Sequence, residues 1–326
     1  MTGTCMELNR CVVTGAAGFI GSHLVDRLLA QGVTVVGLDN LKLGRRENLS
    51  AALAQPGFRF YEADLNDLAA CRRILGAGPA GGSFDAVWHL AANSDIRAGV
   101  SDPDVDLRDT FQTTHNTLRL MREFGIPRIA FASTSAIYGQ LDRLLTEDIG
   151  PLFPISNYGA MKLASEAAIS AALESYLAQA WIFRFPNVIG GRATHGAIYD
   201  FVQKLKRNPA ELEVLGDGTQ EKPYFHVSEL LDAMLFIVGN ATEKLNVFNL
   251  GTTGSTTTVR RLAETVVAHM APGATIRYGT GNKGWVGDVP KFNYSTERLR
   301  RLGWTPKLTS DEALVRSVVE IVNESR

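Results

Sequence analysis

The chain has 326 residues, more than a typical single domain, and 45% of them are hydrophobic, enough for a sizeable core. Its formal net charge is −1, with 33 Lys and Arg residues against 34 Asp and Glu residues, so no overall charge favours nucleic acid or an anionic membrane as a partner. The three cysteines are not clustered, which fits neither a disulfide framework nor a metal site and indicates a reducing cytoplasm. No apolar segment reaches the roughly 18 residues that a membrane helix needs.

A strand–helix–strand unit opens the chain. Residues 11–14 form a short apolar strand, and Ile20, Leu24 and Leu28 then recur at helical spacing until Gly32. Residues 33–38 form a second buried strand that ends at Asp39. This order within about 30 residues predicts a βαβ unit.

The alternation of strands and helices continues to residue 185. We predict strands at 58–61, 86–90, 128–132 and 180–185, and helices at 109–124 and 158–178. Continuous apolar strands separated by helices are typical of a parallel sheet that is covered on both faces. The predicted fold class is therefore α/β, with a Rossmann-type doubly wound parallel sheet.

The regular alternation of strands and helices ends after residue 187, where Gly and Pro become frequent and the predicted elements become shorter. We predict a smaller C-terminal α/β lobe that binds the substrate. A helix at 227–238 and a strand at 247–250 are expected to return to the first lobe. The predicted division is therefore 8–187 for the Rossmann domain, with returns near 227–250, and 188–326 mainly for the second lobe; residues 76–83 are predicted to be a surface loop.

A glycine-rich loop, Gly15-Ala16-Ala17-Gly18-Phe19-Ile20-Gly21, joins the first strand to the first helix. Glycines let the backbone approach a pyrophosphate, and the helix N-terminus offers free N–H groups and a positive dipole end. The spacing is G-x-x-G-x-x-G rather than G-x-G-x-x-G, and a tight turn with close helix packing is the alternative. The position between strand and helix favours a dinucleotide site.

Asp39 ends the second strand. A carboxylate there accepts hydrogen bonds from a ribose diol and repels a 2′-phosphate, which favours NAD over NADP. Arg45 and Arg46 follow closely and soften that discrimination. The alternative is an aspartate that caps a turn.

Tyr158 and Lys162 lie four residues apart, on one face of the predicted helix. A free phenol has a pKa near 10, and a nearby ammonium lowers that pKa, so the pair can act as a base. An exposed Tyr/Lys pair is the alternative. The segment Ser133-Thr134-Ser135 follows the fifth strand, where hydroxyl groups meet a substrate or, alternatively, make turns.

Together these segments resemble the extended short-chain dehydrogenase/reductase family, in its nucleotide-sugar epimerase and dehydratase branch, with a pattern closest to UDP-sugar 4-epimerases. The resemblance covers nearly the whole chain. It is carried by TGAAGFIG at 14–21, Asp39, Asp64-Leu65, HLAA at 89–92, the segment 133–139, Tyr158 with Lys162, RFPNVIG at 184–190, GDGTQ at 216–220 and GWTP at 303–306.

The resemblance implies a role for particular residues. Thr134, Tyr158 and Lys162 are the implied catalytic group, and a homodimer is implied through the helices at 109–124 and 158–178. The residues implied for binding NAD are Gly15, Gly18, Phe19, Ile20, Asp39, Asn40, Asp64, Leu65, Leu90, Ala91, Ala92, Ser133, Tyr158, Lys162, Phe185 and Val188. Those assigned to the nucleotide-sugar substrate are Ser94, Thr134, Ser135, Asn187, Arg192, Leu215, Lys222, Trp285 and Asp288.

The reactions of this branch share the oxidation of C4 and then diverge. Its 4,6-dehydratases carry an acidic pair after the catalytic threonine, and its decarboxylases carry a Glu two residues before the tyrosine of that segment. Ser135 and Ala136 stand there in this chain, so an elimination lacks its acid and base. We therefore expect a 4-epimerase acting on UDP-glucose/galactose or UDP-glucuronate/galacturonate. The alternatives are a decarboxylase, a 4,6-dehydratase, a C4 oxidoreductase and a non-catalytic nucleotide-binding protein.

Four positions depart from the family's pattern. Lys222 stands where the family often has Arg, and Trp285 stands near the position of a second phosphate-binding Arg. Ser94 replaces a frequent polar or basic residue, and Thr113 replaces a frequent Asn. A lysine lacks the bidentate fork of arginine, so we expect a rearranged diphosphate site.

Overall fold

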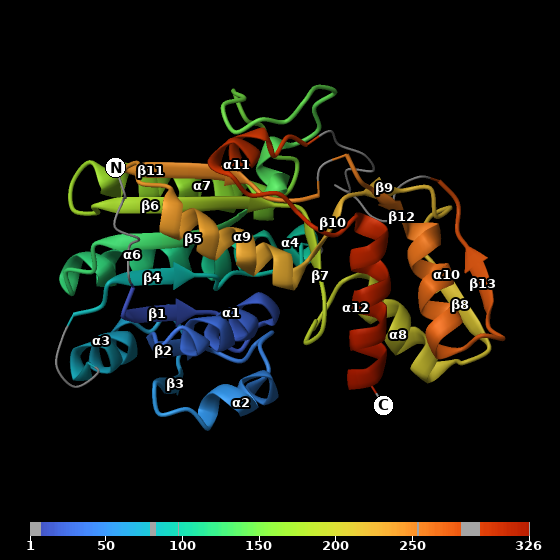
Figure 1. Cartoon of the computed structure of the whole chain (residues 1–326), viewed down its shortest axis with the longest axis horizontal. Helices are drawn as coiled ribbons and strands as arrows, with labels where there is room; N and C mark the ends of the chain where they lie inside the picture. The colour runs from blue at the N-terminus through green and yellow to red at the C-terminus, as the bar shows by residue number, and fades with distance from the viewer. Residues whose placement is uncertain (1–7, 79–82, 97, 253, 282–293, 326) are drawn as a thin grey trace.

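The computed structural model describes residues 8–78, 83–96, 98–252, 254–281 and 294–325. A seven-stranded sheet with the order β11-β6-β5-β4-β1-β2-β3 forms the larger lobe, and every neighbouring pair is parallel (Figure 1). Its strands are β1 (Arg10–Thr14), β2 (Thr34–Asp39), β3 (Phe58–Glu62), β4 (Ala86–His89), β5 (Arg128–Thr134), β6 (Gln179–Phe185) and β11 (Leu245–Asn249). The predicted doubly wound parallel sheet is confirmed, because the strand order reverses direction on either side of β1 and β4.

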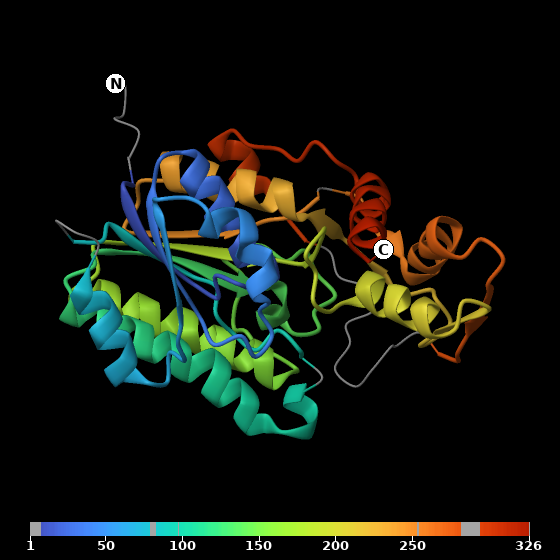
Figure 2. The same cartoon turned by 90° about the horizontal axis from the view of Figure 1, so that it is seen from below.

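Helices cover both faces of this sheet (Figure 2). One face packs against α1 (Phe19–Ala30) and α9 (Val227–Asn240), and the other packs against α3 (Leu68–Ala77), α6 (Thr113–Glu123) and α7 (Asn157–Leu173). Successive strand residues point to opposite faces, so Val13 joins the first core and Val12 joins the second. This two-sided burial explains why the strands read as unbroken apolar runs in the sequence.

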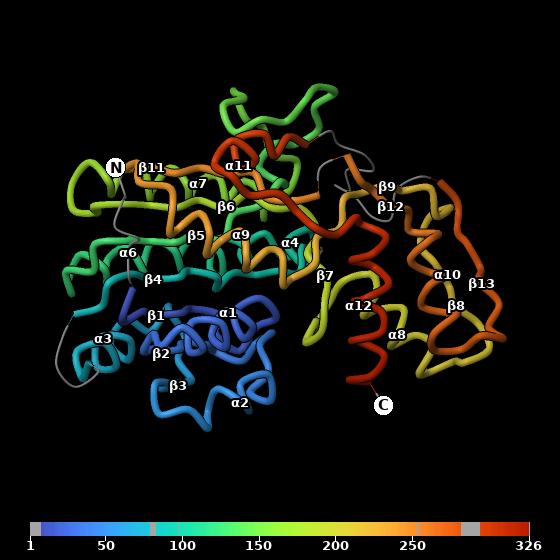
Figure 3. The backbone as a smooth tube through the Cα atoms, in the orientation of Figure 1, coloured from blue at the N-terminus to red at the C-terminus, as the bar shows by residue number. Residues whose placement is uncertain are grey.

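The smaller lobe has its own core. Helices α8 (Ala197–Arg207), α10 (Val259–Met270) and α12 (Ser310–Glu324) pack around β8 (Glu211–Val214) and β13 (Thr275–Tyr278), which are parallel. The tube in Figure 3 shows that the chain returns to the sheet at α9 and β11 and again at α11 (Glu297–Leu302), which contacts both of them. The sequence suggested the first return but not the second.

Short elements complete the fold. They are α2 (Ser50–Leu53), α4 (Ala98–Ser101), α5 (Pro103–Asp106), the 3₁₀ helices η1 (Arg46–Leu49) and η3 (Ser135–Tyr138), the π-helix η2 (Leu107–Gln112), and the strands β7 (Asn187–Ile189), β9 (Glu221–Lys222), β10 (Tyr224–His226) and β12 (Thr257–Thr258). Within the part of the chain that the structure describes, no helix has the length and apolar character that a membrane crossing requires.

Three predicted elements differ from the structure. The helix expected at 109–124 begins as the π-helix η2, which leads into α6. The helix expected at 158–178 begins at Asn157, because the Ser156 side chain accepts a hydrogen bond from the N–H of Gly159, and it ends at Leu173. The loop expected at 76–83 starts later, because α3 extends through Ala77, and residues 79–82 lie outside the described residues.

A buried ion pair ties α7 to the sheet. The Arg184 Nη2 atom on β6 lies 2.6 Å from the Glu166 Oε2 atom on α7, and both side chains are less than a tenth exposed. The Ser133 hydroxyl on β5 donates to the other carboxylate oxygen at 2.5 Å. Glu166 therefore joins one helix to two neighbouring strands.

Replacing Glu166 with Gln should lower the free energy of unfolding by about 3–5 kcal/mol, because it leaves the Arg184 guanidinium buried without a counter-charge. Urea unfolding monitored by circular dichroism measures this change. The control is Glu174→Gln, which removes a carboxylate from the end of the same helix, where Glu174 pairs with Lys244 in solvent. That variant should change the stability by less than about 1 kcal/mol, and equal losses in the two variants would contradict the role of the buried pair.

Candidate active site

A cleft of about 1260 Å³ lies at the carboxyl ends of the sheet strands and is lined by residues of both lobes. Single small-molecule sites usually measure about 300–1,000 Å³, so this cleft has room for two ligands side by side. Crevices at the carboxyl ends of strands are where doubly wound sheets bind their ligands. The described residues contain no group of three or more His, Cys, Asp or Glu side chains placed to hold a metal ion.

The glycine-rich loop forms the floor of this cleft below α1. Gly15 has a φ of +69°, and a Cβ atom there would lie 2.8 Å from the Ala91 nitrogen. A Cβ atom on Gly21 would lie 1.9 Å from the Gly15 carbonyl oxygen, so the helix can rest on the loop only if residue 21 is glycine. Gly18 is the N-cap and supplies no capping side chain, which leaves the first N–H groups of α1 open to the cleft. Such a cradle suits the pyrophosphate of a dinucleotide.

Asp39 lines the cleft but is only 8% exposed. Its carboxylate accepts hydrogen bonds from the N–H groups of Ala17, at 3.0 Å, and Leu41, at 2.8 Å. Burial raises the pKa of Asp39, and these backbone N–H groups oppose that rise. Asp39 thus holds the glycine loop in place as well as facing the position expected for a ribose.

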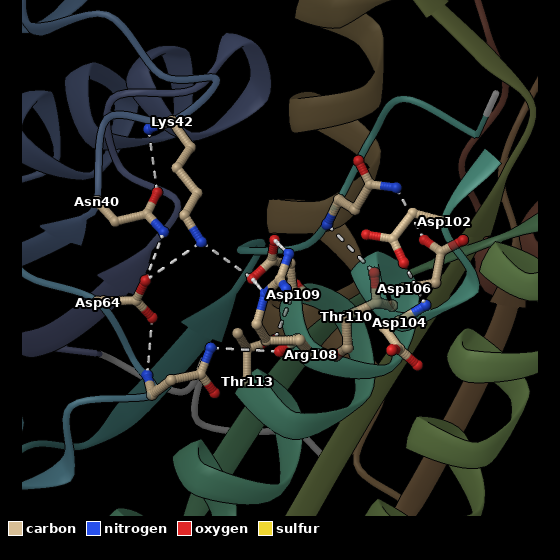
Figure 4. Close-up of polar contacts among 12 residues, drawn as sticks. Asn40, Lys42, Asp64, Asp102, Asp104, Asp106, Arg108, Asp109, Thr110 and Thr113 are labelled. Carbon is tan, nitrogen blue, oxygen red and sulfur yellow. Dashed lines mark hydrogen bonds and ion pairs between the residues drawn. The ribbon is translucent and has the colours of Figure 1, made fainter. Parts of the chain in front are cut away.

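A second carboxylate that lines the cleft is that of Asp64 (Figure 4). The Asn40 amide donates to Asp64 at 3.0 Å, and the Lys42 Nζ atom lies 3.5 Å from the same carboxylate and 3.2 Å from that of Asp109. Although burial alone would raise it, the N–H of Asn66, the Asn40 amide and the Lys42 ammonium together lower the pKa of Asp64. This part of the cleft is therefore polar and charged.

The three predicted catalytic side chains meet in the middle of the cleft. Tyr158 and Lys162 lie on the first turns of α7, and Thr134 ends β5. The Lys162 Nζ atom donates to the Ala132 carbonyl at 2.6 Å and lies 5.9 Å from the centre of the Tyr158 ring. A Cβ atom on Gly159 would lie 2.7 Å from the Ala136 carbonyl oxygen, so this glycine allows α7 to approach the hydroxyl segment closely.

Burial governs the protonation of this group. It lowers the pKa of Lys162 to about 7, against the attraction of the Glu166 and Asp106 carboxylates. It also raises the pKa of Tyr158, and the Asp106 charge adds to that rise while a hydrogen bond with Thr134 opposes it. The Lys162 side chain therefore changes charge near neutral pH, whereas the Tyr158 phenol holds its proton until an added positive charge favours its release.

His89 is buried, and the sequence identifies it only as part of the HLAA segment at 89–92, without a role of its own. Its Nδ1 atom lies 2.7 Å from the Thr14 hydroxyl and its Nε2 atom lies 3.0 Å from the Thr114 hydroxyl. The Thr14 hydroxyl oxygen accepts from the N–H groups of Leu90 and Ala91, so its own proton goes to Nδ1 and His89 carries its proton on Nε2. Burial lowers the pKa of His89 to about 3, so it is neutral and joins the cleft floor to α6.

Most of the predicted binding residues line the cleft together. For the cofactor these are Gly15, Gly18, Phe19, Ile20, Asp39, Asn40, Asp64, Leu65, Leu90, Ala91, Ala92, Tyr158, Lys162, Phe185 and Val188, and for the substrate they are Ser94, Thr134, Ser135, Asn187, Leu215 and Lys222.

Two predicted residues do not line the cleft. Ser133 turns to the opposite face of β5 from Thr134 and donates to Glu166. Arg192 adopts a φ of +61°, and its guanidinium pairs with Asp26 of α1 at 2.7 Å. Trp285 and Asp288, which were also predicted to bind the substrate, lie outside the described residues.

The cleft also contains residues that were not predicted. Lys204 and Arg207 of α8 line it beside Gln203, at a helical spacing that a search of the second lobe for basic faces would have detected. Asn93 lines the cleft as well, and no local pattern marks it in the sequence. Arg45 donates to the Tyr199 hydroxyl at 2.6 Å, so it bridges the two lobes rather than facing a ribose phosphate.

The sequence and the fold are similar to those of known proteins. The family model described as the NAD dependent epimerase/dehydratase family matches residues 11–251. A UDP-glucose 4-epimerase of Mycolicibacterium smegmatis is 30% identical over 323 residues, which cover 97% of this chain and 100% of the relative. A UDP-glucuronate 4-epimerase of Thermodesulfobacterium geofontis is 27% identical over 315 residues and covers 94% of each chain. The solved structure of a UDP-glucose 4-epimerase of Thermus thermophilus in complex with NAD is 31% identical, with a TM-score of 0.81 and coverage of 95% of this chain and 98% of that one.

Replacing Gly21 with Ala should weaken NAD binding about fivefold or more, because the added Cβ atom forces the Gly15 carbonyl and the loop away from α1 at a cost of about 1–3 kcal/mol. Isothermal titration calorimetry on protein stripped of its cofactor measures the affinity. The control is Gly273→Ala, whose Cβ atom would meet nothing within 4 Å. If the Gly21 variant binds NAD within about twofold of the native affinity, a difference of less than about 0.5 kcal/mol, the glycine loop is not the pyrophosphate site.

Proposed function

The chain belongs to the NAD dependent epimerase/dehydratase family, and we propose that it is a nucleotide-sugar 4-epimerase. It inverts C4 of a UDP-sugar through a transient 4-keto sugar that stays in the cleft. The observation that carries this proposal is the Thr134–Tyr158–Lys162 group beside a hydroxyl segment with no carboxylate at residues 135 and 136.

The cofactor and the sugar share one cleft in this proposal. NAD, when bound, supplies a hydride acceptor at C4 and afterwards returns the hydride. The glycine cradle and the open N–H groups of α1 would hold its pyrophosphate, and Asp39 and Asp64 would hold its adenosine. The printed description of the family as NAD dependent supports this assignment.

The three catalytic side chains divide the proton transfer among them. The Tyr158 phenolate oxygen would take the proton of the C4 hydroxyl, which makes it a phenol, and would later return that proton to the reduced product. The Lys162 ammonium, which the Ala132 carbonyl holds 5.9 Å from the centre of the Tyr158 ring, stabilises the phenolate. The Thr134 hydroxyl donates to the oxygen at C4 as it becomes a carbonyl.

The hydroxyl segment separates epimerisation from elimination. Ser135 and Ala136 carry no group that can remove a proton from C5 or protonate a leaving hydroxyl at C6. An epimerisation needs neither, because the ketose only has to turn over and accept hydride on its other face. Ser135 and Asn187 line the cleft and offer hydrogen bonds to the sugar in either orientation.

The second lobe would hold the nucleotide. Leu215 is 51% exposed at the cleft and offers an apolar surface to a base. Lys204, Arg207 and Lys222 line the same end and supply positive charge for a diphosphate. The named UDP-sugar relatives support a UDP-glucose/galactose or UDP-glucuronate/galacturonate pair.

A panel of UDP-sugars incubated with the enzyme and NAD, and read by proton NMR, should reveal inversion at C4 without net NADH. Tyr158→Phe should lower this activity by about 10²–10⁴-fold, because it removes the proton acceptor. The control is Tyr176→Phe, which removes a hydroxyl bound to the Leu118 carbonyl beyond the end of α7. Accumulation of NADH, carbon dioxide or a 4-keto-6-deoxy product would instead assign a C4 oxidoreductase, a decarboxylase or a 4,6-dehydratase.

We also propose that the chain forms a homodimer through α6 and α7. These helices lie side by side on the outer face of the larger lobe (Figure 2), and they contact one another. Ala167 and Ala171 are exposed on α7, which permits close helix packing. Leu107, at the start of the π-helix that contacts both helices, is 48% exposed and offers an apolar side chain to a partner.

Light scattering coupled to size exclusion should give twice the chain mass for the native protein. Leu107→Asp should shift the population toward the single-chain mass, because it places a charge in the apolar contact. The control is Val319→Asp, which charges a side chain with 40% exposure on α12 of the other lobe. A single-chain mass for the native protein at micromolar concentration would disprove the dimer.

A reducing cytoplasm suits the cysteines, and we propose this location. Cys11 and Cys71 are buried and carry free thiols. Burial raises the pKa of Cys11 to about 12 and that of Cys71 to about 11, so both stay protonated and unreactive. Free thiols of this kind are typical of proteins that are not exposed to disulfide formation.

A further inference from the structure

Asp106 is a buried acid with an incomplete set of hydrogen bonds. It ends α5, and its side chain is 0% exposed. The Asn93 amide donates to its Oδ1 atom at 2.8 Å, whereas its Oδ2 atom has no hydrogen-bond partner among the described residues (Figure 4). A buried carboxylate oxygen without a partner is costly, so its presence calls for an explanation.

Asp106 holds the turn that lines the cleft at Asn93, Ser94 and Asp95. Its partner Asn93 also donates to the Asp95 carbonyl at 2.9 Å and accepts from the Asp95 N–H at 3.1 Å. The Thr110 hydroxyl, one helical turn after Asp106, accepts from the Asn93 N–H at 3.2 Å. The turn that presents Ser94 to the cleft is therefore held by Asp106 and Thr110 together.

Asp106 also packs close to the start of the catalytic helix. A Cβ atom on Gly99 of α4 would lie 1.9 Å from its Oδ2 atom, so only glycine fits against the carboxylate. The Gly99 carbonyl accepts from the Asn157 side chain at 2.7 Å, and Asn157 directly precedes Tyr158. The π-helix that follows Asp106 has extensive contacts with α7, and π-helical turns are frequent at functional sites.

Several charged groups face this region from the surrounding elements. Asp95 lies on the cleft turn, Asp109 on the π-helix, and Tyr158 and Lys162 on α7. Burial and the charges of Asp109 and Asp95 raise the pKa of Asp106, whereas the Asn93 amide and Lys162 oppose that rise. In return, the Asp106 charge makes the Tyr158 phenol harder to ionise.

We propose that Asp106 is a positioning residue whose charge sets the pH range in which Tyr158 releases its proton. This inference rests on the proposed role of Tyr158 as the proton acceptor. Among the described residues no ion pair cancels the Asp106 charge and its Oδ2 atom has no hydrogen-bond partner, so the charge acts on Tyr158 from the end of α5, which contacts α7. The hydrogen bond that Oδ1 accepts from the Asn93 amide meanwhile holds the cleft turn at Ser94 in place.

Asp106→Asn separates the effect of the charge from that of the hydrogen bond, because an amide oxygen still accepts from Asn93 but carries no charge. The acid limb of the kcat/KM profile should move to lower pH by about half a unit to one unit, the size expected for a neighbouring charge in a partly buried site. At about one pH unit below the native midpoint, the variant should then be about threefold to fivefold more active. The control is Asp104→Asn, which removes an exposed carboxylate from the same helix and should leave the profile in place.

A second measurement does not depend on the reaction. Carbon-13-labelled tyrosine reports phenol ionisation by NMR in the enzyme with NAD bound, and Tyr158→Phe identifies the signal of residue 158. The Tyr158 midpoint should fall in Asp106→Asn by the same amount as the kinetic limb. If the Asn variant is too unstable to purify, Asp106→Ser removes the same charge and is titrated in its place.

The outcomes separate this inference from the proposed function. A Tyr158 midpoint that is unchanged on removing the Asp106 charge overturns the inference, whatever the activity. A lowered midpoint in a protein that epimerises no UDP-sugar supports the inference and overturns the proposed function. A lowered midpoint in Asp104→Asn as well would show a general effect of net charge and would also overturn the inference.

Discussion

The Lys162 ammonium, buried and hydrogen-bonded to the Ala132 carbonyl, is the constraint on which the site depends. This contact joins α7 to the carboxyl end of β5, so it sets the distance between the phenol of Tyr158 and the hydroxyl of Thr134. Burial lowers the pKa of Lys162 to about 7, against the attraction of the Glu166 and Asp106 carboxylates. The site thereby places the Lys162 amine, which gains or loses its proton near neutral pH, one helical turn from the Tyr158 phenol.

The sequence predicted features that are encoded within a few neighbouring residues. The glycine loop, Asp39 and the Tyr158–Lys162 pair could be found because local spacing determines which way their backbone or side chains face. Ser133 and Arg192 could not be placed in this way. The side of β5 that Ser133 occupies depends on which strand face α7 covers, and the direction of Arg192 depends on its positive φ and on the distant partner Asp26.

The same distinction holds for the fold. Apolar runs and helical periodicity predicted the sheet, because burial on both faces leaves a strong pattern. The return of α11 and the π-helix η2 leave no such pattern, since each is determined by the surface against which it packs. Asp106 and Asn93 belong to this second class, because their pairing joins two segments that are separated by a helix and a turn.

The two carboxyl groups near the catalytic pair differ in how their charge is balanced. Glu166 lies one turn below Lys162 and is neutralised by the Arg184 guanidinium, with a further hydrogen bond from Ser133. Asp106 receives only the neutral Asn93 amide among the described residues, so its charge is not cancelled locally. Both carboxylates stabilise the Lys162 ammonium, but only Asp106 contributes to the raised pKa of Tyr158. The ion pair therefore serves chiefly to anchor α7, while the unbalanced acid is the one able to influence the proton on the phenol.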